Sequence, residues 1–168
     1  MKIFIETLGC KVNTYESEMM QEKLLSNGFI ETYDNDAYIV IINTCSVTNM
    51  ADAKSRKLIR YAKRENKDAI IVVCGCSAEN HKEELLNLDV NIFIGNKDKS
   101  KIVDIINNYC QSNEQYTKFY DNKHLGFENM EVDKFQDQTR AYMKIQDGCN
   151  NYCAYCIIPY VRGNIRSK

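Results

Sequence analysis

The sequence predicts an α/β fold, a parallel sheet with flanking helices, followed by the start of a second domain. Two observations predict it: β-branched apolar runs that alternate with helix-like stretches, and a change to a cysteine-rich loop near the carboxyl end. Strand–helix alternation implies right-handed crossovers, which make the strands parallel. We expect an α/β domain at 1–110, a connecting segment at 111–138 and the second domain at 139–168.

The predicted strands of the first domain are continuous apolar runs, as is typical of strands covered on both faces. They are Lys2–Glu6, Tyr38–Ile42, Ala69–Val73 and Asn91–Ile94. The predicted helices have apolar residues at helical spacing, and they are Glu16–Leu25, Ala51–Arg64, Glu83–Leu88 and Ser100–Tyr109. The connecting segment is polar and weakly periodic, so we expect it to pack on a surface and to contain a short strand or two. The run Ala141–Ile145 predicts a further strand, directly before the cysteine-rich loop.

The composition is that of a globular protein, with 44% hydrophobic and 27% charged residues. The formal net charge of −1 provides no overall attraction to nucleic acid, so any such attraction must come from local patches.

Eight cysteines raise the alternative of a secreted disulfide scaffold. The apolar run at the amino terminus is too short for a signal peptide and is interrupted by Glu6. No stretch approaches the roughly 18 apolar residues that a membrane span needs. We therefore expect a cytoplasmic protein without a membrane partner, whose cysteines serve metal or redox chemistry.

Cys149, Cys153 and Cys156 form a CxxxCxxC loop, with Tyr155 directly before the last cysteine. Three thiolates can hold three irons of a 4Fe–4S cluster and leave the fourth iron open to a substrate. The alternative is zinc, which in structural sites takes four protein ligands from paired motifs. The nearest histidine, His124, lies far upstream and is a poor fourth ligand.

Three further cysteines are spread over the first domain, and each follows a predicted strand. They form the first triplet along the chain, and the three cysteines of the loop form the second triplet. Cys10 follows the first strand, Cys45 the second and Cys76 the third. Since the carboxyl ends of parallel strands share one edge of the sheet, these thiols could meet there and hold another 4Fe–4S cluster, the first along the chain. The alternative is that they are buried, unreactive cysteines, which are common in proteins.

The strings Ala141–Cys149 and Cys156–Gly163 resemble the methylthiotransferase branch of the radical S-adenosylmethionine (SAM) superfamily. Further matching strings extend the resemblance from Lys2 to Lys168, and they are Thr7–Asn13, Asn43–Thr48, Ala51–Arg56 and Gly75–Glu79. One departure is Glu79, where the family more often has glutamine.

The resemblance implies a methylthiotransferase amino-terminal domain, followed by the first strand and cluster loop of a partial TIM-type radical SAM barrel. It implies two 4Fe–4S clusters, one on each triplet, with SAM bound at the loop cluster and its adenine beside Tyr155. It also implies that Cys76 is a ligand and the neighbouring Cys74 is not. Cys110 fits neither triplet, and we expect it to be an ordinary helix-end cysteine. A reductant protein such as flavodoxin or ferredoxin would be a partner.

Three strings resemble the branch that modifies threonylcarbamoyladenosine in tRNA: Gly9–Glu16, Thr48–Asp52 and Gln146–Asn151. The resemblance implies that one SAM methylates a sulfur at the first cluster. A second SAM gives a radical that removes hydrogen from the adenine, to which the methylthio group is added at carbon 2. The branch for isopentenyladenosine, which usually has Gln-Met-Asn after its first cysteine, stays open. So do the ribosomal-protein branch, which Lys11–Asn13 disfavours, and a non-catalytic iron–sulfur module.

A basic helical segment could contact tRNA phosphates, although an ordinary solvated helix face is an equal alternative. It contains Lys54, Arg56, Lys57, Arg60, Lys63, Arg64 and Lys67. A smaller basic group near the loop contains Arg162, Arg166 and Lys168. Because most of a barrel is lacking, the resemblance further implies a fragment of a longer enzyme, without turnover of its own.

Overall fold

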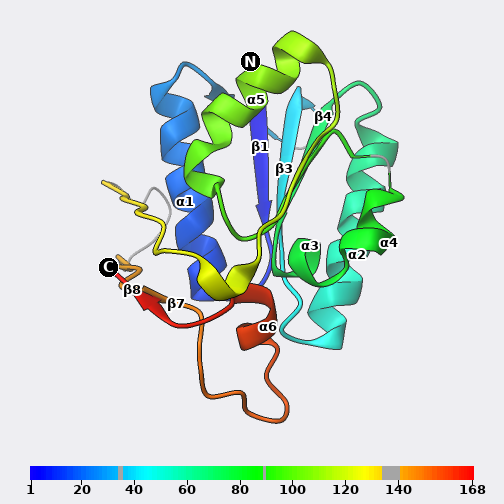
Figure 1. Cartoon of the computed structure of the whole chain (residues 1–168). Helices are drawn as coiled ribbons and strands as arrows, with labels where there is room; N and C mark the ends of the chain where they lie inside the picture. The colour runs from blue at the N-terminus through cyan, green and yellow to red at the C-terminus, as the bar shows by residue number, and fades with distance from the viewer. Residues whose placement is uncertain (34–35, 89, 134–140) are drawn as a thin grey trace.

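The computed structural model describes residues 1–33, 36–88, 90–133 and 141–168. Its centre is a six-stranded sheet in the order β2-β1-β3-β4-β5-β6, in which all neighbouring strands are parallel (Figure 1). The strands are β1 (Lys2–Thr7), β2 (Ile30–Glu31), β3 (Ile39–Thr44), β4 (Ile70–Gly75), β5 (Ile92–Ile94) and β6 (Tyr116–Lys118). The predicted parallel α/β fold is confirmed.

Helices cover both faces of the sheet, so the domain has three layers (Figure 1). One face is covered by α1 (Lys11–Ser26) and α5 (Ile102–Ser112), and the other by α2 (Asn49–Glu65), α3 (Cys76–Asn80) and α4 (Lys82–Leu86). Alternation along β3 serves both layers, because Ile41 packs with the first pair of helices and Ile42 with the second group. Every residue of β3 is therefore buried, which explains the continuous apolar run.

Short elements extend the sheet at its edges. β6 lies in the connecting segment, where the sequence predicts a short strand or two. β2 is not predicted, because its two exposed residues are too few to produce a pattern. The 3₁₀ helix η2 (Lys99–Lys101) precedes α5, and the 3₁₀ helix η3 (Asn122–His124) follows β6.

The register of the sheet brings the ends of three strands to one level. Thr7 of β1 pairs with Asn43 of β3, and Asn43 pairs with Cys74 of β4. The three cysteine-bearing segments that follow these strands therefore start side by side.

The predicted strand at Ala141–Ile145 is wrong, because these residues lie outside any strand. Met143 and Ile145 are 77% and 62% exposed, whereas Lys144 between them is buried. The Glu16 carboxylate draws Lys144 inward. Because neighbouring side chains of an extended run point to opposite sides, the apolar Met143 and Ile145 point outward.

Beyond this run lies a small antiparallel ribbon. β7 (Gln146–Asp147) pairs with β8 (Arg166–Ser167), and α6 (Ile158–Arg162) lies between them in the sequence. The described residues thus form a two-stranded ribbon where the resemblance implies the first strand of a barrel. The predicted domain boundary between 138 and 139 lies outside the described residues. None of the helices in the described part of the chain is long and apolar enough to cross a membrane.

Ile41→Ala should lower the free energy of unfolding by about 2–5 kcal/mol, because Ile41 is fully buried and its truncation leaves a cavity. Ile30→Ala, at the exposed edge strand, should change it by less than about 0.5 kcal/mol. Urea unfolding followed by circular dichroism measures both values. Equal losses would contradict the assignment of β3 to the centre of the core.

Candidate metal centres at the carboxyl edge of the sheet

The first triplet lies at the carboxyl edge of the sheet, where three segments leave the strands. Cys10 is the exposed residue that precedes α1. Cys45 directly follows β3, and Cys76 is the first residue of α3; both are buried. The structure therefore brings the three predicted residues to the same edge.

Two glycines permit this close approach. Gly9 has a φ of 109°, and a Cβ at this position would lie 2.6 Å from Sγ of Cys45. Gly75 has a φ of 99°, and a Cβ there would lie 2.4 Å from the carbonyl oxygen of Thr44. Because only glycine tolerates both the left-handed backbone and the contact, the segments before Cys10 and Cys76 can lie directly against the end of β3.

Buried polar side chains fix these segments. Nδ2 of Asn13 donates to the carbonyl oxygens of Leu8 at 2.7 Å and Thr44 at 2.9 Å. Oγ of Ser55 accepts from the backbone N–H of Cys45 at 3.1 Å and donates to its carbonyl oxygen at 3.0 Å. These bonds satisfy backbone groups that the sheet ladder leaves unpaired, and they hold the loops in one conformation.

The thiols of this edge influence one another's ionisation. Burial raises the pKa of Cys45, an N–H bond from Val47 opposes this, and the nearby thiols of Cys76 and Cys10 raise it further. Cys74 belongs to the core under α1 and α5, and burial is the main reason that its pKa rises to about 11. Cys74 therefore stays protonated at neutral pH. The nearby guanidinium of Arg162 acts in the opposite direction and lowers the pKa of both Cys45 and Cys74.

Within the described residues, no three Cys, His, Asp or Glu side chains surround one point as the ligands of a single metal ion would. A 4Fe–4S cluster makes a different demand, since each thiolate binds its own iron and the sulfurs stay several ångströms apart. Three thiols on separate segments of one edge fit such a cluster.

The second triplet lies on a loop beyond the same edge, between β7 and α6 (Figure 1). Cys149 and Cys156 are half-buried and Cys153 is exposed. The Cys156 N–H donates to the Cys153 carbonyl at 2.9 Å, and the Cys149 N–H donates to the Gly163 carbonyl at 3.1 Å, so the loop is closed at its base. Tyr155 is 92% exposed, and its place beside the SAM adenine stays a prediction.

A buried ionic network joins this loop to the first domain. Its centre is Glu16 of α1, whose carboxylate oxygens lie 2.5 Å from Nζ of Lys99 and 2.7 Å from Nζ of Lys144. Nη1 of Arg162 lies 2.8 Å from the same carboxylate and 3.0 Å from that of Asp147. Lys144, Asp147 and Arg162 flank the loop, so these ion pairs fix its base against α1.

The charges of this network support one another. Burial opposes the ionisation of Glu16, but Arg162, Lys99 and Lys144 outweigh burial and hold the pKa of its carboxyl well below the ordinary range. In the same way Glu16 outweighs the burial of Lys99 and Arg162 and raises the pKa of both. Glu16, Lys99 and Arg162 are therefore charged at neutral pH.

Glu79, the departure from the family pattern, has a cation beside it. Nζ of Lys82 lies 2.6 Å from one carboxylate oxygen of Glu79, and the N–H of Asn96 donates to the other at 3.3 Å. A Cβ at Gly95 would lie 1.8 Å from this second oxygen, so the carboxylate occupies space that only glycine leaves open.

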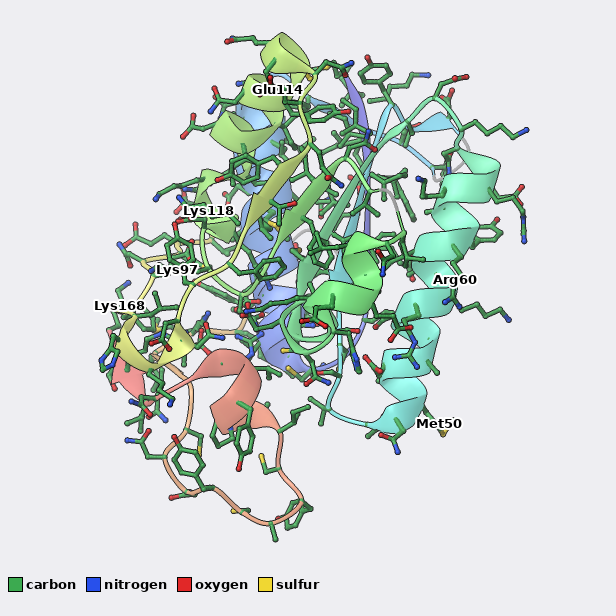
Figure 2. The ribbon with its side chains drawn as sticks, turned by 45° about the vertical axis from the view of Figure 1, so that its right-hand side comes forward. Met50, Arg60, Lys97, Glu114, Lys118 and Lys168 are labelled. Carbon is green, nitrogen blue, oxygen red and sulfur yellow. The ribbon has the colours of Figure 1, made fainter. Side chains whose placement is uncertain are left out.

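The predicted basic segment is only partly a free surface. Arg60 points away from α2 into the surroundings (Figure 2). Arg56 instead pairs with Asp52 within the helix and approaches Glu84 at 3.5 Å, so it is not part of an exposed basic stripe. The exposed cations of this segment are Lys54, Lys57, Arg60, Arg64 and Lys67.

Residues 2–95 match the family described as Uncharacterized protein family UPF0004. The chain belongs to this family. The part that matches UPF0004 contains the sheet as far as β5 and the whole first triplet.

The similarity of the UPF0004 chain to curated relatives reaches beyond residue 95 and includes the loop of the second triplet. The chain is 39% identical to "Threonylcarbamoyladenosine tRNA methylthiotransferase MtaB" of Bacillus subtilis and 34% identical to the protein of that name in Aquifex aeolicus. It is 37% identical to "tRNA-2-methylthio-N(6)-dimethylallyladenosine synthase" of Thermodesulfovibrio yellowstonii. Each match covers 99% of this chain, and the chain spans 38%, 42% and 39% of the three relatives.

The sheet of the UPF0004 chain also has a structural neighbour. The isolated REC domain of RcsB from Salmonella enterica superposes with a TM-score of 0.50 at 16% identity, over 70% of this chain and 92% of that one. This likeness shows the α/β fold alone.

Sequence reasoning missed the ionic network of the UPF0004 chain. One signal was present, because Glu16 lies one helical turn before Met19 and Met20 and so shares their buried face. Its partners Lys99 and Arg162 come from distant segments, and no local pattern indicates them.

Glu16→Gln should lower the free energy of unfolding by about 3–5 kcal/mol at pH 7, because it leaves buried cations without their carboxylate. The folded-state pKa of Glu16 lies below its ordinary value of 4.5, so its contribution is present above that value and is lost as the pH falls toward the folded-state pKa. The difference between the wild type and the variant should therefore shrink in acid, as urea unfolding at pH 7 and below pH 4.5 can measure.

The matched control is Glu131→Gln, since this exposed carboxylate lies 3.5 Å from Lys168 at the surface. Its free energy of unfolding should stay close to that of the wild type. A Glu16→Gln deficit that stays constant into acid would contradict the buried ion pairs.

Proposed function

We propose that this protein is a tRNA methylthiotransferase, which adds a methylthio group to carbon 2 of the adenine of threonylcarbamoyladenosine next to the anticodon. The observation on which the proposal rests is that two cysteine triplets belong to one packed unit. The ion pair between Glu16 and Arg162 fixes the loop of the second triplet to the edge that bears the first. Relatives named for this reaction, matched over 99% of the chain, support it.

We assign a first 4Fe–4S cluster to Cys10, Cys45 and Cys76. The buried thiols would hold it against the sheet edge, and the exposed Cys10 leaves one side open to a second reactant. Cys74 is left out of this set because its side chain is fully buried in the apolar core under α1 and α5.

We assign a second 4Fe–4S cluster to Cys149, Cys153 and Cys156, with SAM at its open iron. The exposed ring of Tyr155 is available for stacking on the adenine of SAM. When bound, the clusters and SAM supply the sulfur, the methyl group and the radical chemistry. The chain supplies binding, orientation and the exclusion of water, which Glu16 and Arg162 serve by fixing the loop.

The partners follow from this assignment. The tRNA would meet the exposed cations of α2, which can neutralise phosphates. A reductant protein such as flavodoxin or ferredoxin would deliver electrons, in the cytoplasm and without a membrane partner. The division into 1–110, 111–138 and 139–168 belongs to the same proposal, with the last part as the start of a radical SAM domain.

The branch for isopentenyladenosine, also called dimethylallyladenosine, is the second candidate. A relative named for it is 37% identical to this chain, and the two threonylcarbamoyladenosine relatives are 39% and 34% identical. Asn13 is common to the first-cysteine strings of both branches, and its bonds to Leu8 and Thr44 are structural. Within this string the distinction therefore rests on Lys11 and Val12, and Nζ of Lys11 lies 5.0 Å from the ring centre of Tyr142.

Anaerobic reconstitution should give about eight irons per chain, as two 4Fe–4S clusters, and changing Cys149, Cys153 and Cys156 together to Ala should remove about half. In that triple variant, Cys76→Ala should remove the remaining iron. Cys74→Ala should keep it, since the Cys74 side chain is fully buried in the apolar core under α1 and α5. Iron analysis and absorption spectra measure these contents. Equal losses in both single variants would contradict the assignment of Cys76.

Deleting the gene that encodes this chain should abolish the methylthio group on threonylcarbamoyladenosine in tRNA. The unthiolated nucleoside should accumulate, while the dimethylallyl nucleoside keeps its methylthio group. Mass spectrometry of digested tRNA measures all of these nucleosides, and re-expression of the full-length gene is the control. Loss from the dimethylallyl nucleoside instead would move the protein to the other branch. No change in any methylthio nucleoside would favour a non-catalytic iron–sulfur module.

A further inference from the structure

The buried network at the base of the loop has unequal numbers of charges. Its cations are Lys99, Lys144 and Arg162, and its carboxylates are Glu16 and Asp147, all with side chains at most 6% exposed. Within the described residues the network therefore has one more positive than negative charge. Arg166 adds another at the rim, where it is 9% exposed and lies 3.3 Å from Asp147.

An excess charge in a protein interior is costly unless a group of opposite sign lies close by. On the side of the sheet, Cys76 of the first triplet lies beside the network. Nδ2 of Asn96 lies 3.7 Å from Sγ of Cys76 and donates at 2.8 Å to the carbonyl of Val161, the residue before Arg162. Oδ1 of the same Asn96 lies 3.5 Å from Nζ of Lys99. Asn96 thus lies between Cys76, the Lys99 ammonium and the backbone directly before Arg162.

Arg162 is the cation that serves both parts of the molecule. Its guanidinium bonds Glu16 and Asn13 of α1 and Asp147 at the base of the loop. It also lies within electrostatic reach of Cys45 and Cys76. The residue that fixes the second triplet's loop therefore borders the first triplet.

We propose that the excess positive charge of this network is the counter-charge of the cluster bound by Cys10, Cys45 and Cys76, with Arg162 as its positioning residue. The inference rests on the function proposed above. A 4Fe–4S core of charge about +2 on three thiolates has a net charge of about −1, which is opposite in sign to the excess. Through Arg162, the loop of the second triplet stabilises the first cluster without contributing a ligand to it.

The test measures the first cluster alone, in the full chain with Cys149, Cys153 and Cys156 changed to Ala. Arg162→Gln removes a positive charge, so the midpoint potential of the cluster should become more negative and a chelator should remove iron faster. Asp147→Asn removes a negative charge of the same network, so the potential should become more positive. Arg162→Lys should stay near the parent, and Arg166→Gln should shift the potential less than Arg162→Gln. Electron paramagnetic resonance during redox titration measures the potentials.

Opposite shifts in Arg162→Gln and Asp147→Asn support the counter-charge, because a merely structural disturbance would move both in one direction. Shifts of the same sign, or none, in folded variants that hold iron would overturn it and leave the cluster assignment intact. A folded parent that takes up no iron would overturn both proposals. If Arg162→Gln fails to fold by circular dichroism, Asp147→Asn decides alone, and a potential that does not become more positive overturns the inference.

Discussion

The burial of one carboxylate constrains how the two parts of this chain meet. Removing the charge of Glu16 from water costs several kcal/mol, and only close cations offset that cost. One of them, Lys99, is supplied by the segment before α5, and the others, Lys144 and Arg162, come from either side of the cysteine loop. The loop is therefore held in place by the requirement to compensate a charge, together with the buried Pro159 and Val161 of α6. Met143 and Ile145, next to Lys144, remain exposed.

The sheet edge depends on a different constraint, the level register of three parallel strands. Since β1, β3 and β4 end together, the backbone groups beyond them need partners, and polar side chains such as Asn13 and Ser55 provide them. Two glycines remove the side chains that would separate the segments. The same features that complete the hydrogen bonding of the edge also place thiols of three distant segments together.

The sequence was sufficient to predict β1, β3, β4 and β5, because burial on both faces leaves an unbroken apolar run, as in β3. It was also sufficient to predict that Cys10, Cys45 and Cys76 lie at one edge of the sheet, since that follows from the parallel topology. The strand predicted at Ala141–Ile145 failed because a local apolar pattern does not show that Lys144 has a carboxylate partner. Long-range charge pairing has no periodicity, and for the same reason the role of Arg162 was not visible in the sequence.

The pairing of Glu16 with Arg162 spans 146 residues, which sets an order of events during protein synthesis. Helix α1 leaves the ribosome well before its guanidinium partner, because Arg162 comes 146 residues later in the chain. Domains generally fold from the amino terminus as they are made, so the sheet can form while Glu16 has only Lys99 as a buried cation. A chain interrupted before the loop would keep this carboxylate undercompensated and would open more readily to proteases. The network thus makes the durability of the first domain depend on completion of the segment that bears the second triplet.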